Sequence, residues 1–131
     1  ALMASSLPKS MVYVIDDDLD VLGSLRFLLE TEGFDVLTFR SGAAMLDPDI
    51  ARRGDCFVID YKMPNMNGID LANYLRAHDI TAPIILITGY PDQTIPEKAA
   101  AAGLHHVLLK PHLEENLVTH IRQAMQEQAA R

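Results

Sequence analysis

Short apolar runs alternate with longer amphipathic stretches along the whole chain. The runs are rich in β-branched and other apolar residues, and turn or capping residues follow each of them, which is typical of β-strands. Three runs are apolar throughout instead of alternating, as expected for parallel strands that are covered on both faces. The pattern therefore predicts five strands, over residues 11–15, 35–39, 56–59, 83–87 and 106–109.

The stretches between the runs have the spacing of helices. Apolar residues from Val21 to Leu29 recur at intervals of three and four residues, with Gly33 as the stop. Ser41 is a suitable N-cap for a short second helix, which we expect to end by Pro48. Three further helices are predicted, over residues 68–78, over residues 91–102 and after Pro111.

The alternation of strands and helices indicates the fold class. Five such pairs within 131 residues predict an α/β protein. We expect a flavodoxin-like (βα)5 domain, in which helices cover both faces of a doubly wound parallel five-stranded sheet. This domain should occupy residues 11–129. Residues 1–10 show no periodicity and start with Ala-Leu before Met3, so we expect a disordered leader that is in part a cloning remnant.

Composition and charge exclude several classes of protein. The net charge of −7 argues against direct binding of nucleic acid or of an anionic membrane surface. Cys56 is the single cysteine, so neither an intrachain disulfide nor a Cys-rich zinc site can form; we expect it to be a packed thiol. No apolar run approaches the length of a membrane span, and the first residues lack the pattern of a signal peptide. We therefore expect a cytoplasmic protein.

Polar side chains with related chemistry follow four of the predicted strands. Ligand sites in doubly wound sheets lie beyond the carboxyl ends of the strands, so these side chains should meet. Clustered carboxylates suit Mg²⁺, while ammonium and hydroxyl groups suit phosphoryl oxygens. A carboxylate can also be the nucleophile that accepts a phosphoryl group. The residues are Asp16 and Asp17 after the first strand, Asp60 after the third, Thr88 after the fourth and Lys110 after the fifth; Asp18 is interpreted as a helix cap.

Four motifs at these positions resemble a known family. They are V-I-D-D-D at 14–18, V-I-D-Y-K-M-P-N-M-N-G at 58–68, I-L-I-T-G at 85–89 and L-L-K-P at 108–111. Together they are similar to the receiver domain of bacterial two-component response regulators, in particular to receivers of helix-turn-helix transcription regulators. The resemblance covers about residues 10–128.

The resemblance implies a role for each matching residue. Asp60 would accept a phosphoryl group from a sensor histidine kinase or a phosphotransfer protein. Asp16 and Asp17 would bind Mg²⁺ together with Asp60 and the backbone carbonyl of Lys62. Two further residues would contact the phosphoryl oxygens, Lys110 as an ion pair and Thr88 through its hydroxyl, and the bond before Pro111 would be cis. Phosphorylation would then change the surface of the fourth helix, fifth strand and fifth helix, through which a homodimer would form.

Three positions near the site modify this expectation. Receivers often have Tyr or Phe three residues before the lysine, where this chain has Val107, so we expect a weaker or differently transmitted response. Lys62 and Tyr90 should flank the phosphoryl group and slow its loss.

Three histidines near the last strand could suggest a metal site: His105, His106 and His112. Adjacent residues of a strand point to opposite faces, however, so His105 and His106 are a poor pair of metal ligands. We therefore interpret these histidines as surface or loop residues.

Other functions remain to be weighed against a receiver. A receiver-like interaction module that works without phosphate is the main alternative, although the complete set of acidic, hydroxyl and lysine residues argues against it. A Mg²⁺-dependent phosphohydrolase generally needs a second carboxylate two residues after the nucleophile, where this chain has Lys62. A flavodoxin-like cofactor binder needs a Ser/Thr/Gly-rich loop after the first strand, where this chain has three aspartates.

Overall fold

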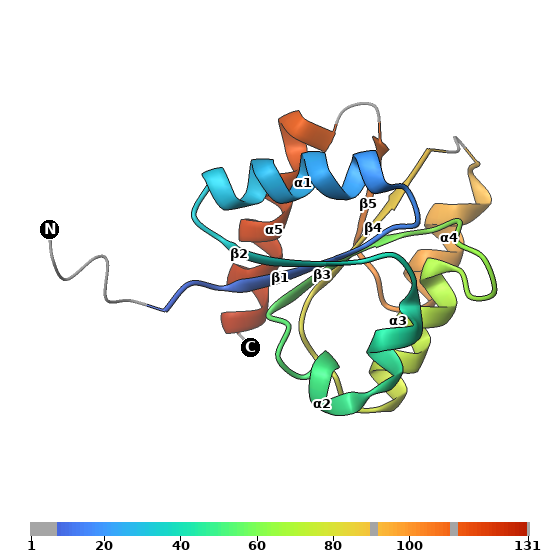
Figure 1. Cartoon of the computed structure of the whole chain (residues 1–131). Coiled ribbons are helices and arrows are strands. Elements are labelled where there is room, and N and C mark those ends of the chain that lie inside the picture. Colours follow the sequence, from blue (N-terminus) through green and yellow to red (C-terminus); the bar gives the residue numbers. More distant parts are fainter. Residues whose placement is uncertain (1–7, 90–91, 111–112, 131) are drawn as a thin grey trace, which may run out of the picture.

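A single parallel sheet forms the centre of the molecule (Figure 1). The computed structural model describes residues 8–89, 92–110 and 113–130. The strand order is β2-β1-β3-β4-β5, and every neighbouring pair is parallel. This confirms the predicted doubly wound sheet. The strands are β1 (Met11–Ile15), β2 (Asp35–Phe39), β3 (Cys56–Asp60), β4 (Ile84–Thr88) and β5 (His106–Leu109).

Helices cover both faces of the sheet. One face packs against α1 (Leu19–Thr31) and α5 (Leu113–Ala129). The other packs against α3 (Gly68–Ala77), α4 (Thr94–Ala101) and the short α2 (Pro48–Ala51) (Figure 1). Strands β3 and β4 are buried along their whole length, which explains why their sequences do not alternate.

Local hydrogen bonds fix where the helices begin. The Asp18 carboxylate accepts hydrogen bonds from the backbone N–H groups of Asp20 and Val21, so Asp18 caps α1 as predicted. A capping box starts α3, in which Asn67 and Asp70 accept from one another's backbone N–H groups. These caps set the positions of the two helices that follow the acidic strand ends.

The second helical segment differs from the prediction. Ser41 does cap a helix, but that helix is a 3₁₀ helix, Gly42–Leu46. Helical structure does not end by Pro48, because Pro48 is the first residue of α2. A proline is favourable there, since the first helical N–H has no partner within the helix.

The fourth helix also starts later than predicted, at Thr94, where Asp92 accepts hydrogen bonds from the backbone N–H and the hydroxyl of Thr94.

The core confirms the expectation for the single cysteine. Cys56 is fully buried in β3, and burial raises the pKa of its thiol to about 12. Nearby, the ring of Tyr13 makes edge contacts with Phe39 and Phe57, and its hydroxyl donates to the backbone carbonyl of Ile50. In the described part of the chain, every helix is too short or too polar to cross a bilayer.

Two predictions lie largely or wholly outside the described residues. The leader was expected over residues 1–10, of which the structure describes 8–10, without regular structure. The cis bond before Pro111 cannot be compared, because residues 111 and 112 are not described.

Candidate functional site

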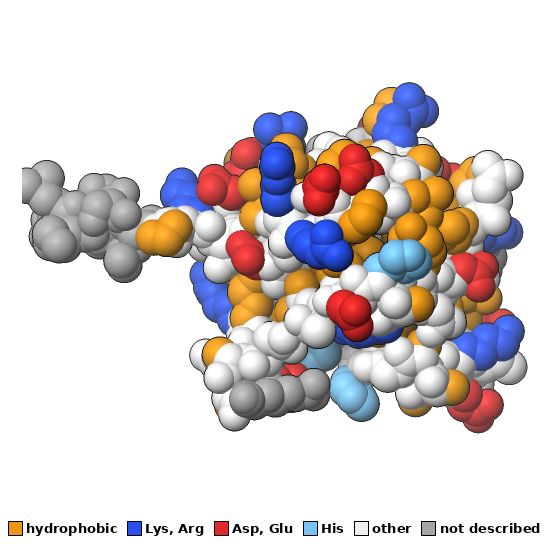
Figure 2. All heavy atoms as spheres, turned by 90° about the horizontal axis from the view of Figure 1, so that it is seen from below, with side chains coloured by type: hydrophobic (Ala, Val, Ile, Leu, Met, Phe, Trp, Pro, Cys, Tyr) orange, Lys and Arg blue, Asp and Glu red, His pale blue; other side chains and the backbone are white. Residues whose placement is uncertain are grey.

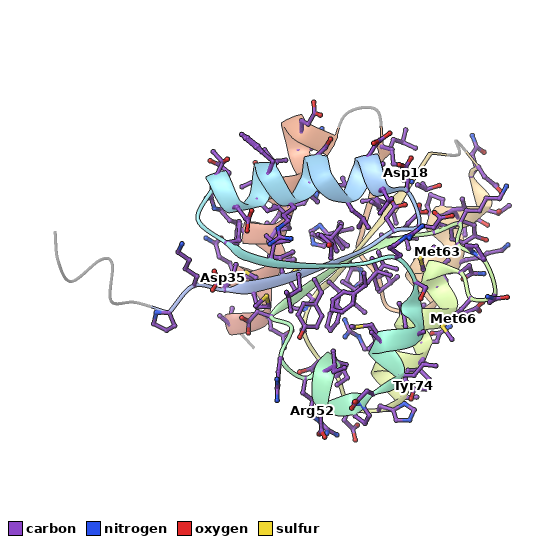
Figure 3. All side chains as sticks on the ribbon, in the orientation of Figure 1. Asp18, Asp35, Arg52, Met63, Met66 and Tyr74 are labelled. Carbon is purple, nitrogen blue, oxygen red and sulfur yellow. The ribbon has the colours of Figure 1, made fainter. Side chains whose placement is uncertain are left out.

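The polar residues predicted from the strand ends meet at one edge of the sheet. Asp16 directly follows β1, Asp60 is the last residue of β3, and Lys110 directly follows β5. Thr88 is the last residue of β4, which lies between β3 and β5. In Figure 3, Asp18 and Met63 mark this end of the molecule, whereas Asp35 lies at the opposite end, where β2 begins.

Two of the three carboxylates are buried. Asp16 is fully buried and Asp60 is 3% exposed, whereas Asp17 is exposed. Carboxylate oxygens of the three residues lie within 4.8 Å of one another. Such a group is unfavourable by itself, because each buried carboxylate loses hydration and repels the others.

Lys110 lies between the two buried carboxylates. Its Nζ is 3.0 Å from Asp16 Oδ2 and 3.2 Å from Asp60 Oδ1. The other Asp16 oxygen, Oδ1, accepts a hydrogen bond of 2.9 Å from the backbone N–H of Asp18. One ammonium group therefore bridges the carboxyl ends of β1, β3 and β5.

The proton affinities of these groups reflect burial and mutual repulsion. Burial, followed by the charge of Asp16, raises the pKa of Asp60 to about 6, although Lys110 acts in the opposite direction. Burial also raises the pKa of Asp16. Burial would lower the pKa of Lys110, but its contacts with Asp16 and Asp60 outweigh that effect and raise it. At neutral pH the structure therefore holds carboxylates that would gain from a further positive charge.

The donor set fits a hard divalent cation. Carboxylate oxygens are the ligands that Mg²⁺ prefers in proteins, and three residues can each supply one. Asp16 Oδ2 is buried, and among the described residues it accepts no hydrogen bond of regular geometry despite its proximity to Lys110. A buried oxygen in that situation is suited to a metal ion.

An open hollow gives access to this cluster. It has a volume of about 530 Å³, and its lining includes Asp17, Asp60, Lys62, Gly89 and Lys110. Lys62 is exposed and lines this hollow together with Asp60. The other residue expected to flank the phosphoryl group, Tyr90, lies outside the described residues.

Thr88 and Val107 border a different hollow. Thr88 is buried, and together with Ile95, Leu104 and Val107 it lines a space of about 640 Å³ between α4 and β5. The strand register places Val107 opposite Leu86, two residues before Thr88. Thr88 and Val107 therefore border the same space, which a larger side chain at position 107 could occupy.

The loop after Asp60 is held by close backbone contacts that the sequence did not reveal. A Cβ atom at Gly68 would lie 2.5 Å from the backbone oxygen of Asp60 and 2.7 Å from Leu86 Cδ1. Glycine is therefore required here by this close approach. Met63 is buried and Met66 is half-buried, and both pack against the core.

The histidines only partly match the prediction. His105 is exposed, as expected, and His112 lies outside the described residues. The side chain of His106, in contrast, is 12% exposed and contacts His120 and Glu127 of α5. The prediction of a surface position is wrong for His106, because α5 crosses beside this end of β5.

Comparisons with known proteins agree with this geometry. The family described as the response regulator receiver domain matches residues 12–122. The transcriptional regulatory protein FixJ of Bradyrhizobium diazoefficiens is 34% identical over 119 residues, which are 91% of this chain and 58% of that protein. The response regulator protein TodT of Pseudomonas putida is 36% identical over 117 residues, 88% of this chain and 51% of that protein. The chain thus spans about half the length of these relatives.

A solved structure has the same architecture along nearly its whole length. It is the crystal structure of a response regulator receiver domain protein from Clostridium thermocellum, with a TM-score of 0.84 and 27% sequence identity. The alignment covers 92% of this chain and 98% of that one. The matching fold, the family match and the acidic cluster at the strand ends lead to one conclusion: this chain belongs to the receiver domain family of two-component response regulators.

Proposed function

We propose that Asp60 is the phosphoacceptor of this chain, and that a sensor histidine kinase or a phosphotransfer protein supplies the phosphoryl group. The observation that carries the proposal is the Asp60 carboxylate, which lies at the floor of an open hollow with a lysine ammonium 3.2 Å away. A carboxylate oxygen of Asp60 would attack phosphorus of a phosphohistidine. The O–P bond forms as the N–P bond breaks, and the imidazole leaves.

Mg²⁺ would be held by the carboxylates of Asp16, Asp17 and Asp60 and by the backbone carbonyl of Lys62. When bound, the ion supplies positive charge to the phosphoryl oxygens and to the carboxylates. Lys110 would pair with a phosphoryl oxygen, and for this its ammonium must turn from the carboxylates that it now bridges. The Thr88 hydroxyl would donate a hydrogen bond to another phosphoryl oxygen.

The signal would leave the site through α4, β5 and α5. Phosphorylation would favour one of two states that already exchange, and so change the surface by which an output domain, a partner or a second copy binds. The space beside Val107 supports a transmission that differs from that of receivers with an aromatic residue there. Backbone shifts of α4 and β5 would replace the movement of a ring.

We place the receiver at residues 11–129 and in the cytoplasm. The acidic net charge argues against direct binding of nucleic acid by this domain, so nucleic acid would be bound by an output domain or a partner instead. On the face shown in Figure 2, lysine and arginine side chains stand apart among acidic and apolar ones, which also favours this view.

The direct test is phosphorylation by a small donor. The protein is incubated with Mg²⁺ and acetyl phosphate, and its intact mass is measured beside that of Asp60→Asn. We expect the gain of one phosphoryl group in the wild type, and none in the variant or in the presence of a chelator. No gain in a protein that binds Mg²⁺ would instead support an interaction module that works without phosphate.

A second test concerns the lifetime of the phosphoryl group. Lys62 and Tyr90 would hinder the approach of a hydrolytic water molecule, so their removal should speed dephosphorylation. The decay of the phosphorylated mass is followed in the wild type and in the Lys62→Ala, Tyr90→Ala double variant. Equal decay rates would rule out this role.

A further inference from the structure

A chain of three ionisable side chains links the strand β5 to the helix α5. His106 of β5 and His120 of α5 face each other, with Nδ1 to Nδ1 at 3.0 Å. On its other side, His106 Nε2 lies 3.1 Å from Glu127 Oε1. The two helix residues are seven positions apart, which is about two helical turns, so His106 contacts the same side of α5 at two points. None of these residues belongs to the acidic site.

The hydrogen-bond directions follow from the chemistry of the groups. An ionised carboxylate can only accept, so the Nε2–H of His106 donates to Glu127. A neutral His106 then has an unprotonated Nδ1, which must accept. His120 must therefore donate its Nδ1–H to His106. At neutral pH the network has one consistent arrangement, and every facing atom is satisfied.

The same contact tolerates one added proton but not two. With one, the shared Nδ1···Nδ1 contact still has a single proton between its two nitrogens, and either imidazole can carry the charge. With two, an N–H group of each ring faces the other at 3.0 Å, and two positive charges lie side by side. The contact that joins β5 to α5 must then open.

We propose that His106, His120 and Glu127 form a proton-sensitive latch, which holds the C-terminal half of α5 against β5 at neutral pH and loosens in mild acid. Burial, with a smaller effect of His106, lowers the pKa of His120, which is the direction that disfavours a charge on this ring. The Glu127 side chain is 54% exposed, so its ion pair with a charged His106 is weak and does not offset the repulsion.

The described residues of the hollow beside the latch supply no carboxylate other than that of Glu127 to compensate the charge. A small hollow beside the latch is lined by His106 and Glu127, by Arg76 of α3 and by His105. Ile84 of β4 is apolar, and Arg76 donates its Nη1–H groups to the backbone carbonyls of Ile80 and Ala82. Among the described residues that line this hollow, Glu127 is thus the one acidic group.

The first experiment determines the tautomers in the unphosphorylated wild type. Long-range ¹H–¹⁵N spectra of the imidazoles at pH 7.5 should show His106 protonated at Nε2 and His120 protonated at Nδ1. The reverse tautomers would overturn the proposal. Because no phosphate is involved, the result does not depend on the proposed function.

The second experiment measures how the unfolding equilibrium depends on pH. An unfolded histidine titrates near pH 6.5, so a residue that stays neutral in the fold raises the unfolding constant up to about tenfold between pH 7.5 and pH 5.5. The folded-state pKa of His120 is lowered. The contribution of neutral His120 to the stability of the fold is therefore present above pH 6.5 and is lost as the pH falls below that value. Urea unfolding should therefore show that the unfolding constant increases more between pH 7.5 and pH 5.5 in the wild type than in His120→Asn. The amide of this variant keeps a neutral donor near the position of Nδ1.

The matched control is His105→Gln, which removes the exposed neighbouring histidine. It should retain the pH dependence of the wild type, because His105 is outside the latch. Asp60 and all other titratable groups are the same in these proteins, so their contributions cancel in the comparison. An equal pH dependence in wild type and His120→Asn would refute the latch, even where both proteins fold well.

Discussion

Replacing the carboxylate of Asp60, the proposed acceptor, should stabilise the unphosphorylated protein. Asp60 is 3% exposed, lies close to the Asp16 carboxylate, and has a pKa of about 6 in the fold. In an unfolded chain the pKa of an aspartate is about 3.9. The folded state therefore resists the ionisation of Asp60, and at neutral pH this reduces the free energy of unfolding. Asp60→Asn removes the charge and keeps a side chain of similar size.

The expected magnitude follows from this difference in pKa. Each unit corresponds to about 1.4 kcal/mol, so at pH 7.5 without Mg²⁺ the variant should be more stable by about 2 to 3 kcal/mol. A raised carboxylate pKa means that the fold binds the proton more tightly, so wild-type stability recovers as the pH falls through 6 toward 4. At pH 4.5 the advantage of the variant should have fallen to about 1 kcal/mol.

The assay is urea unfolding of both proteins at pH 7.5 and at pH 4.5, with a chelator present. Asp17→Asn is the matched control, because Asp17 has the same charge at the same edge but is exposed. Its effect should stay within about 0.5 kcal/mol. Equal stabilities of wild type and Asp60→Asn at pH 7.5, or an advantage that does not shrink at pH 4.5, would refute the electrostatic reasoning.

Three further predictions test other parts of the structure. Gly68→Ala should lower the free energy of unfolding by roughly 1–3 kcal/mol, because its Cβ would meet the backbone oxygen of Asp60 at 2.5 Å; Gly23→Ala in α1, with open space around it, should instead add roughly 0.5–1 kcal/mol in the same denaturation assay. Cys56, with a pKa of about 12, should react with a thiol reagent no faster than the protein opens, and fast labelling of the native protein would contradict its burial. Val107→Tyr should change partner affinity or dimerisation after phosphorylation, as measured by binding and sedimentation, since its ring would enter the space beside Thr88; unchanged values would exclude a role of that position in the switch.

The strands and the site residues were predictable because the sequence encodes both locally. Each strand is an apolar run that turn residues interrupt, and the predicted and observed ends differ by at most one residue. Once the strands are parallel, the residues at their carboxyl ends must share one edge of the sheet. Asp16, Asp60 and Lys110 therefore meet for a topological reason, and the family motifs only add their roles.

The remaining features depend on geometry that short patterns do not contain. Pro48 can end a helix or begin one, and the structure uses it to begin α2. The need for glycine at position 68 arises from the distance to the Asp60 backbone, which follows from how the loop packs on Leu86. The contact of His106 with His120 requires the crossing of β5 and α5, and nothing within either segment specifies it.

The charges of the site explain how its instability and its function are connected. Asp16, Asp17 and Asp60 carry three negative charges when ionised, and Lys110 supplies one positive charge, so the cluster retains a charge of −2. A phosphoryl group on Asp60 replaces one negative charge by nearly two, which brings the cluster close to −3. Lys110 alone cannot balance either state, whereas a divalent cation balances the first and leaves about −1 in the second. The same repulsion that should make Asp60→Asn more stable would therefore favour binding of a divalent cation by the wild type, and a variant that gains stability at this edge should bind Mg²⁺ less tightly.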